Sequence, residues 1–214
     1  IEPIQGEGGD NQFRDEFFVR LRNLCDEEEI LLIFDEVQTG IGITGKMWAH
    51  EHFDVKPDIV AFGKKTQVCG MLASNRINEV KQNVFKESSR INSTFGGNLV
   101  DMYRFKLILE IINKEQLLNN ANVTGAYLLN KINDLSVDFP GFITNPRGAG
   151  LFCAFDFPSG IERDRFISKA FTENLIILGS GDFSIRFRPH LNVQEDDINT
   201  AFEVIYKVVK QMLN

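Results

Sequence analysis

Two pairs of charged residues directly follow apolar segments and are of types that could support catalysis. Asp35 and Glu36 follow ILLIF, and Lys64 and Lys65 follow DIVAFG. Ligands of open α/β sheets bind at the carboxyl ends of strands, and successive strand residues point to opposite faces, so one lysine at most faces the same pocket as Asp35. Alone, the acid could be a helix cap or part of a salt bridge, and the lysine a solvated surface residue. Together they suit a Schiff base between a lysine amine and an aldehyde cofactor such as pyridoxal phosphate.

The glycine-rich segment TGIGITGK, residues 39–46, raises the alternative of a nucleotide site. Its glycines fit the dinucleotide pattern G-x-G-x-x-G, and they come within one residue of the P-loop pattern, with Met47 in place of the magnesium-binding Ser or Thr. A dinucleotide loop follows its strand directly, whereas Asp35 and Glu36 stand between the apolar run and these glycines. Two carboxylates also give the wrong charge for a polyphosphate. The sequence therefore favours a structural glycine loop.

Hydrophobic periodicity indicates alternating helices and strands along the first half of the chain. Phe17, Phe18 and Leu21 have helical spacing, and ILLIFDEV is a continuous apolar run of the kind buried in a parallel sheet. This order is typical of an α/β domain. The predicted elements are a helix at 13–29, strands at 30–37, 58–64 and 70–75, and one long helix or two at 98–134, broken near Asn119 and Asn120.

The pattern changes around residues 135–145 and indicates a smaller α+β domain beyond it. SIRFRPHL, residues 184–191, alternates in the way of a half-buried strand. Further strands are predicted at 150–157 and 175–179, and helices at 163–174 and 195–213. The last of these helices has an apolar stripe of Ile198, Phe202, Ile205, Val209 and Met212. Residues 1–117 are therefore assigned to part of a large parallel-sheet domain and 118–214 to a small domain.

Length and composition limit the classes of function. The chain has 214 residues and a net charge of −7, which argues against a general nucleic-acid binder. No apolar run approaches the roughly 20 residues of a membrane span. The three cysteines are widely spaced, as in reduced thiols of a cytoplasmic protein, and the three histidines form no metal-binding pattern. Because the sequence starts at IEPIQGEGGD, without Met or a leading element, we expect an N-terminal part to precede it.

The stretch FDEVQTGIGITGKMWAHEHFDVKPDIVAFGKK resembles the pyridoxal-phosphate signature of the class III (ω-amino acid) aminotransferases. EPIQGEGGD, NSTFGGN, RGAGL and RFRPHL resemble further motifs of that family in the same order, so the similarity covers essentially the whole chain. Within the family, GKKTQVCG and NSTFGGN are most similar to lysine 6-aminotransferases, because 4-aminobutyrate enzymes share the double lysine but usually differ after it. The resemblance implies a fold-type I transferase, represented here by the C-terminal half of its large domain and its small α+β domain.

The resemblance assigns the cofactor residues one by one. Lys64, which follows a glycine, matches the Schiff-base lysine and the base that moves the proton, while Lys65 is assigned a structural role. Asp35 matches the acid that pairs with the pyridine nitrogen, where a carboxylate keeps that nitrogen protonated. Glu36 is equally well explained as one side of a structural salt bridge.

Four further residues match positions around the cofactor. Val37 is expected to pack on one face of the ring, and Gln38 to bond the ring hydroxyl and to border the substrate. Ser93 and Thr94 match the turn that reaches the phosphate of the neighbouring subunit's cofactor, although Ser-Thr in this context also suits an ordinary turn. The implied assembly is a homodimer with shared active sites.

The substrate residues are implied by the same resemblance. Arg186 matches the arginine that grips the α-carboxylate of 2-oxoglutarate, for which a bidentate guanidinium is suited. Arg188 points to the same face of a regular strand, so the pattern leaves a choice between the two. Glu7 matches a switch residue that neutralises Arg186 when L-lysine enters with its ε-amino group first and swings away for 2-oxoglutarate. Glu2 could help to shape the same pocket.

The implied reaction moves the ε-amino group of L-lysine to 2-oxoglutarate, giving 2-aminoadipate 6-semialdehyde and glutamate. The alternatives are a 4-aminobutyrate or ornithine aminotransferase of the same class, an aminomutase of the same fold, and, from a different class, a non-catalytic fragment or binding domain. The family also needs an N-terminal half with a phosphate loop, a ring-stacking aromatic and a second substrate arginine. Activity is therefore expected only in the complete protein.

Overall fold

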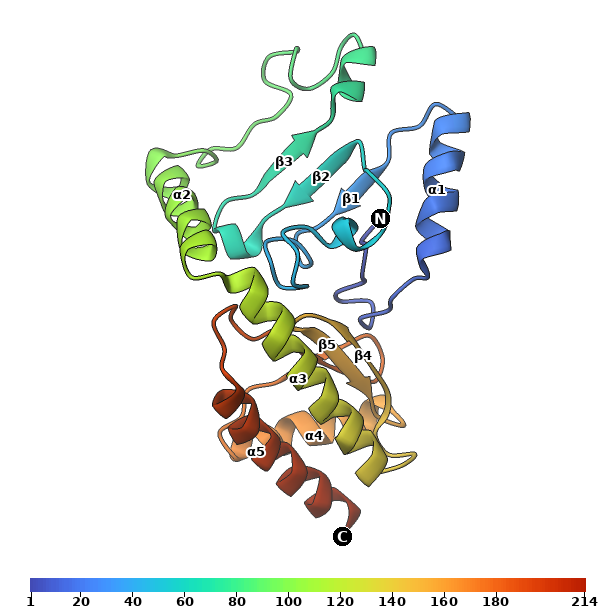
Figure 1. The fold of residues 1–214 in the computed structure, drawn as a ribbon, viewed down its shortest axis with the longest axis vertical. Coiled ribbons are helices and arrows are strands. Elements are labelled where there is room, and N and C mark those ends of the chain that lie inside the picture. The colour runs from blue at the N-terminus through green and yellow to red at the C-terminus, as the bar shows by residue number, and fades with distance from the viewer. The chain divides into compact units, whose positions relative to one another are not determined.

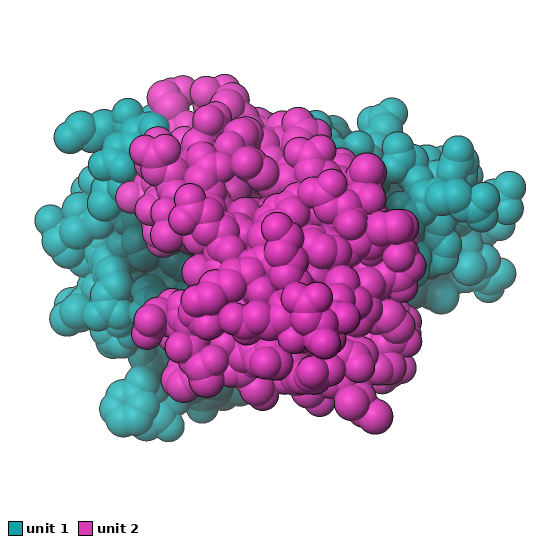
Figure 2. All heavy atoms as spheres, turned by 90° about the horizontal axis from the view of Figure 1, so that it is seen from below, with its two compact units in different colours: residues 1–3, 13–41, 46–115 teal, residues 4–12, 42–45, 116–214 magenta.

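The computed structural model describes residues 1–214 and divides them into two compact units, coloured separately in Figure 2. Unit 1 comprises residues 1–3, 13–41 and 46–115, and unit 2 comprises residues 4–12, 42–45 and 116–214. No sequence pattern indicated that two short segments, 4–12 and 42–45, would group with the C-terminal residues. The assignment of 1–117 and 118–214 to two functional domains stays a prediction.

Unit 1 contains a mixed three-stranded sheet in the order β1-β2-β3 (Figure 1). The first two strands are parallel, as predicted, but β3 runs antiparallel to β2. The connection between them, residues 63–69, is too short for the crossover that a parallel strand needs, which takes a dozen residues or more. The elements of this unit are α1 (Asp15–Glu27), β1 (Ile33–Asp35), β2 (Ile59–Phe62), β3 (Gly70–Ala73), α2 (Leu99–Lys114), and the 3-10 helices η1 (Ala49–His52), η2 (Lys64–Thr66) and η3 (Asn75–Glu79).

A small aromatic core fixes β1 against α1. Phe18 of α1 and Phe34 of β1 are both fully buried, and the Phe18 ring stacks on Phe53 with centroids 4.2 Å apart. Strand residues alternate between faces, so burial of Phe34 on the α1 side turns its neighbour Asp35 to the other face. The apolar residues that end at Phe34 therefore determine where the first candidate catalytic carboxylate lies.

The predicted helical region 98–134 forms two helices, α2 and α3 (Leu117–Asp138), but the predicted break point is wrong. The chain breaks at Gln116, which has a left-handed φ of 54°, and Asn119 and Asn120 both lie inside the first turn of α3. The Asn120 amide donates to the carbonyl oxygens of Leu191, at 2.7 Å, and Val193, at 3.0 Å. Asparagine in this helix thus makes tertiary contacts and does not end it.

Unit 2 is a four-stranded antiparallel sheet, in the order β4-β5-β7-β6, with a layer of helices. Figure 1 shows α3, α4 and α5 beside the labelled strands β4 and β5. The helix α3 packs along β4 and β5, α4 along β6 and β7, and α5 against both other helices. Strand β4 was not predicted, because Pro146 and Gly148 are poor strand residues. The elements are β4 (Thr144–Ala149), β5 (Phe152–Asp156), α4 (Gly160–Thr172), β6 (Leu178–Ser180), β7 (Ser184–Phe187) and α5 (Glu195–Leu213).

The structure confirms the prediction for the last helix, α5, both in its bounds and in the face that it buries. Residues 195–213 are helical, and the five residues of the predicted apolar stripe are all buried. The helix begins with a capping box in which Gln194 and Asp197 satisfy each other's backbone N–H groups. None of the helices in the structure combines the length and apolar composition needed to cross a membrane.

The two faces of β7 differ in chemistry and both are largely covered. Paired residues share a face of the sheet, and Ala154 pairs with Arg186 while Asp156 pairs with Ser184. That face is polar, whereas Phe187 on the opposite face packs on Phe202 of α5. The predicted strand is confirmed over residues 184–187, but its half-buried character is wrong, because Arg147 and segment 4–12 cover the polar face and Ser184 is buried as well.

A close approach between Gly125 of α3 and Gly150 gives the first stability prediction. A Cβ atom on Gly125 would lie 2.2 Å from the carbonyl carbon of Gly150, and backbone cannot move aside cheaply. We expect Gly125→Ala to lower the free energy of unfolding by about 3 kcal/mol, even though alanine favours a helix. Denaturant titration measures this, with the exposed Asn130→Ala on the same helix as control. A Gly125→Ala protein as stable as the control would contradict the packing argument.

Candidate functional site

The ends of two neighbouring parallel strands bring the candidate acid and lysine to one edge of the unit 1 sheet. Asp35 is the last residue of β1 and pairs with Ala61 of β2, and Lys64 stands two residues beyond the end of β2. The Asp35 Oδ1 atom accepts a hydrogen bond from the Val37 N–H at 3.0 Å. This bond fixes the carboxylate while its second oxygen accepts no hydrogen bond within the chain.

Lys64 has a backbone conformation that non-glycine residues rarely adopt. Its φ is +53°, and it opens the short helix η2 immediately after Gly63. Such outliers cost free energy and concentrate at functional sites, so this one supports a functional role for Lys64. The side chain is exposed, and its amine takes part in none of the hydrogen bonds and ion pairs of the structure. A Cβ on Gly63 would lie 3.1 Å from Cys69 Sγ and 3.7 Å from Val37 Cγ1, so the glycine lets both side chains approach.

Lys65 holds the segment that carries Gln38. Its Nζ atom donates to the Gln38 carbonyl oxygen at 2.6 Å, which links the end of β2 to the loop after β1. This contact agrees with the structural role expected for Lys65. It also fixes the backbone of Gln38, whose half-buried side chain was predicted to bond the cofactor ring and border the substrate.

Glu36 has the structural role that was one of its two predicted readings. Its buried carboxylate accepts hydrogen bonds from Thr39 Oγ1 at 2.9 Å, the Ala49 N–H at 2.7 Å and the His50 N–H at 2.9 Å. The His50 ring nitrogen Nδ1 lies 2.8 Å from Glu36 Oε1. Glu36 therefore ties the loop after β1 to η1, and it does not face the same way as Asp35.

Removal of this carboxylate is expected to destabilise the protein strongly. Glu36→Ala would leave several buried donors without an acceptor, at a cost of about 3–5 kcal/mol in the free energy of unfolding. Urea denaturation measures the loss, and the exposed Glu27→Ala, which should change stability by only about 0.5 kcal/mol, is the matched control. A loss below about 1 kcal/mol for Glu36→Ala would show that water replaces the carboxylate at no great cost.

The glycine loop uses its backbone internally. The Gly40 N–H donates to the Glu36 carbonyl oxygen and the Gly45 N–H to that of Gly42, both at 2.9 Å. A Cβ on Gly40 would lie 2.8 Å from the Trp48 ring. These glycines serve close packing, and two N–H groups that a phosphate would need are already bonded, which agrees with the structural reading of the loop.

Ser93 and Thr94 lie in the turn that precedes α2. Ser93 Oγ accepts the Gly96 N–H at 3.1 Å, and Asn98 caps α2 by accepting the Asp101 N–H at 3.0 Å. Both the Ser93 and Thr94 side chains are exposed. No hydrogen bond joins them to Asp35, Gln38 or Lys64 within the chain.

In unit 2, the structure pairs Arg186 with Glu7. Arg186 Nη1 donates to Glu7 Oε1 at 2.6 Å, and the exposed fractions of the two side chains are 12% and 70%. The arginine is thus held by the fold, while its carboxylate partner stands in solvent. This is the pairing expected when Glu7 neutralises Arg186, the state predicted for the binding of L-lysine.

Arg188, the alternative to Arg186, is engaged with a residue that the sequence argument missed. Its guanidinium forms an ion pair with the buried Asp10 and lies over the Phe152 ring, 3.2 Å from the centroid. Asp10 ends the same GEGGD segment that carries Glu7, and this shared segment was the only available signal. Because Arg188 already has a buried partner, Arg186 is the arginine better placed to bind a substrate carboxylate.

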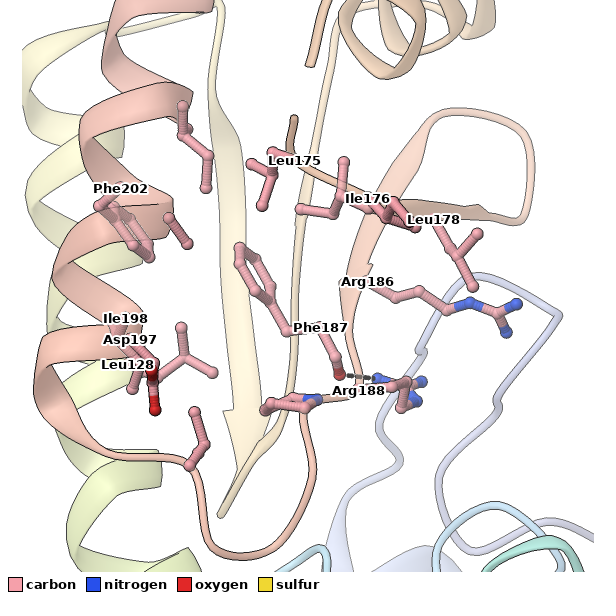
Figure 3. A pocket seen from close by; sticks show the side chains of 15 residues that line it. Leu128, Leu175, Ile176, Leu178, Arg186, Phe187, Arg188, Asp197, Ile198 and Phe202 are labelled. Atoms are coloured by element: carbon pink, nitrogen blue, oxygen red, sulfur yellow. Dashed lines mark hydrogen bonds between the residues drawn. The ribbon is translucent and has the colours of Figure 1, made fainter. Parts of the chain in front are cut away.

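A cavity of about 320 Å³ is lined in part by Arg186 and Arg188, the arginines of these two ion pairs. Residues 175–178 and apolar side chains of α5, among them Ile198 and Phe202, line it. In Figure 3 the Arg186 and Arg188 side chains extend from β7 away from Phe202. Apart from these two arginines and Asp197, the residues that line the cavity are apolar.

The chemistry of the unit 1 residues fits pyridoxal phosphate. The Lys64 amine is exposed and unpaired, and Asp35 keeps one carboxylate oxygen without a hydrogen-bond partner at the same sheet edge. An aldehyde requires such an amine, and a protonated pyridine nitrogen requires such an acceptor. Val37 and Gln38 follow Asp35 directly and lie at that edge as well.

Comparison with known proteins gives the family. The model of the aminotransferase class-III family matches residues 1–209. An L-lysine-epsilon aminotransferase of Mycobacterium tuberculosis is 52% identical over 95% of this chain and 45% of its own length. A 4-aminobutyrate aminotransferase of Dictyostelium discoideum is 40% identical over 99% of this chain and 42% of its own.

Structure comparison agrees with the sequence. The solved lysine aminotransferase from M. tuberculosis, in the internal aldimine form, superposes with a TM-score of 0.94 at 51% identity, over 98% of this chain and 48% of the other. The chain thus spans about half the length of the proteins that it matches. These findings confirm the family and the fold type I architecture predicted from the motifs. The chain belongs to the class III aminotransferases.

Proposed function

We propose that this sequence forms part of a pyridoxal-phosphate-dependent enzyme that transfers the ε-amino group of L-lysine to 2-oxoglutarate. The observation that carries the proposal is the placement of Asp35 and Lys64 at the ends of adjacent parallel strands, in a member of this family. The choice of L-lysine is supported by the higher identity to a lysine enzyme, 52%, than to a 4-aminobutyrate enzyme, 40%. The products are 2-aminoadipate 6-semialdehyde and glutamate.

The proposed roles in unit 1 follow from side-chain chemistry. When bound, pyridoxal phosphate supplies an electron sink for the bond that breaks at the substrate carbon. Lys64 is the nucleophile that anchors the cofactor and, once released, the base that moves the proton. Asp35 accepts a hydrogen bond from the pyridine nitrogen and keeps it protonated. Gln38 bonds the ring hydroxyl, and Val37 packs on the ring.

The proposed roles in unit 2 belong to substrate recognition. Arg186 binds the α-carboxylate of 2-oxoglutarate through its guanidinium, and Glu7 covers that charge when the methylene chain of L-lysine is present. The 2.6 Å ion pair and the exposed position of Glu7 support this exchange, because an exposed carboxylate can leave its partner at little cost.

We further propose that activity belongs to a protein of the relatives' length, acting as a cytoplasmic homodimer. An N-terminal half would supply a phosphate loop, a ring-stacking aromatic and a second substrate arginine. Ser93 and Thr94 would contact the phosphate of the neighbouring subunit's cofactor, for which their exposure in the turn before α2 is suitable.

The test is an absorbance spectrum of the full-length protein with pyridoxal phosphate, before and after L-lysine is added, together with Lys64→Ala. We expect a cofactor band that L-lysine bleaches and that the variant lacks, and one glutamate formed per 2-oxoglutarate consumed. A band bleached only by 4-aminobutyrate or ornithine keeps the family and changes the donor. Turnover without 2-oxoglutarate indicates an aminomutase, and a folded protein without a band indicates a non-catalytic binding domain.

A further inference from the structure

The segment 4–12, which carries Glu7, is closed on itself and fastened to the sheet of unit 2. Ile4 and Gln12 form an antiparallel bridge, and the Gln5 N–H donates to the Asn11 carbonyl oxygen at 3.0 Å. The Gly181 N–H, in the turn between β6 and β7, donates to the Glu7 carbonyl oxygen at 2.8 Å. The backbone of Glu7 is thus fixed, while its side chain reaches Arg186.

Asp10 is a buried anchor of this segment. It is 1% exposed, has a left-handed φ of 54°, and its Oδ2 atom accepts the Ser180 hydroxyl at 2.6 Å. Its Oδ1 atom pairs with Arg188, and its carbonyl oxygen accepts Arg147 Nε at 3.1 Å. One buried residue therefore joins the Glu7 segment to β6, to the end of β7 and to β4.

Arg186 lies on the polar face of β7 and Arg188 directly follows the strand, and the charges of the two guanidinium groups interact. Burial lowers the pKa of Arg188, the nearby Asp10 carboxylate opposes this, and Arg186 lowers it further. Two neighbouring guanidinium groups compete for any carboxylate, whether that of Glu7 or that of a substrate. The ion pair with Asp10 removes Arg188 from this competition.

We propose that Asp10 is a specificity-determining positioning residue: by holding Arg188 in a buried ion pair, it leaves Arg186 alone to exchange between Glu7 and the substrate carboxylate. The inference rests on the proposed function, because it concerns how one pocket serves an amino donor and a keto acid. Loss of the Asp10 charge leaves Glu7 facing two guanidinium groups. The site should then bind the dianionic keto acid more tightly and the amino donor less tightly.

The test compares KM and kcat for L-lysine and for 2-oxoglutarate in the full-length protein. We expect Asp10→Asn to raise the ratio of KM for L-lysine to KM for 2-oxoglutarate about ten-fold, with a smaller change in kcat. The double variant Asp10→Asn/Arg188→Gln removes both charges and should restore the ratio. Asp58→Asn is the matched control, because Asp58 is also a buried carboxylate paired with arginines but belongs to unit 1.

A purely structural role for Asp10 would give a different result. Both KM values would then rise together in Asp10→Asn, and the double variant would not recover, which overturns the proposal. If Asp10→Asn does not fold, Arg188→Gln provides the same test with the opposite sign. The unpaired Asp10 carboxylate would then compete for Arg186 and weaken the binding of 2-oxoglutarate, so the ratio of KM for L-lysine to KM for 2-oxoglutarate should fall. An unchanged ratio in that variant also overturns it. A wild-type protein that transfers no amino group from L-lysine overturns the proposed function instead.

Discussion

Lys64→Ala is expected to lower the rate of glutamate formation from L-lysine and 2-oxoglutarate by at least about 10⁴-fold in the full-length protein. In the proposed mechanism the residue combines two tasks, cofactor attachment and proton transfer. The neighbouring Lys65 donates to the Gln38 carbonyl oxygen at 2.6 Å, so its amine is already committed. A coupled assay of glutamate release measures the rate, and the cofactor absorbance band should be lost with it.

Lys65→Ala is the control for this experiment. It removes an adjacent amine of the same strand end, and with it one hydrogen bond to the backbone of Gln38. The variant should lower the rate of glutamate formation by no more than about ten-fold, because one hydrogen bond contributes about 1 kcal/mol. If Lys65→Ala abolishes the band and Lys64→Ala keeps it, the two assignments are reversed, and the left-handed conformation of Lys64 has a purely structural origin.

The sequence was informative wherever local pattern decides structure. Residues 195–213 carry an apolar stripe of helical spacing, which was visible before any tertiary contact was known, and the structure confirms the helix over that range. The strand ends at Asp35 and Lys64 followed in the same way from continuous apolar runs, which β1 and β2 confirm, although both strands are shorter than predicted.

Features that depend on contacts between distant segments were not predictable. Asn120 reads as a helix breaker in isolation, but its amide bonds to Leu191 and Val193 secure it inside α3. Asp10 ends the EPIQGEGGD motif, but nothing in that motif indicates a partner, and only the fold brings it to Arg188, 178 residues away. The same holds for β4, whose Pro146 and Gly148 argue against a strand until β5 pairs beside it.

The sequence does not distinguish Arg186 from Arg188 as the substrate-binding arginine, but the burial of their carboxylate partners does. An alternating strand places both arginines on one face, and nothing in SIRFR distinguishes them. Burial distinguishes them, since Arg188 is held by a carboxylate that is 1% exposed and Arg186 by one whose side chain is 70% exposed. A ligand can displace the second carboxylate far more cheaply than the first.

Substitution of Arg186 should therefore separate the two half-reactions. Arg186→Gln is expected to lower kcat/KM for 2-oxoglutarate by about 10²- to 10³-fold, or ~3–4 kcal/mol, because the dianion loses its charged partner. The L-lysine half-reaction should change far less, since in that state Arg186 is neutralised by Glu7. Single-turnover measurements of each half-reaction, with the two substrates added separately, give both values.

Glu7→Gln is the mirror of this experiment and decides whether the ion pair is a switch. It keeps the shape of the side chain but removes the charge that covers Arg186 at 2.6 Å. We expect kcat/KM for L-lysine to fall about ten-fold, because the methylene chain then meets an uncovered guanidinium, while the 2-oxoglutarate half-reaction keeps its rate. If both half-reactions proceed at the wild-type rate, Glu7 has no role in substrate recognition, and the discrimination between the two substrates must come from other residues.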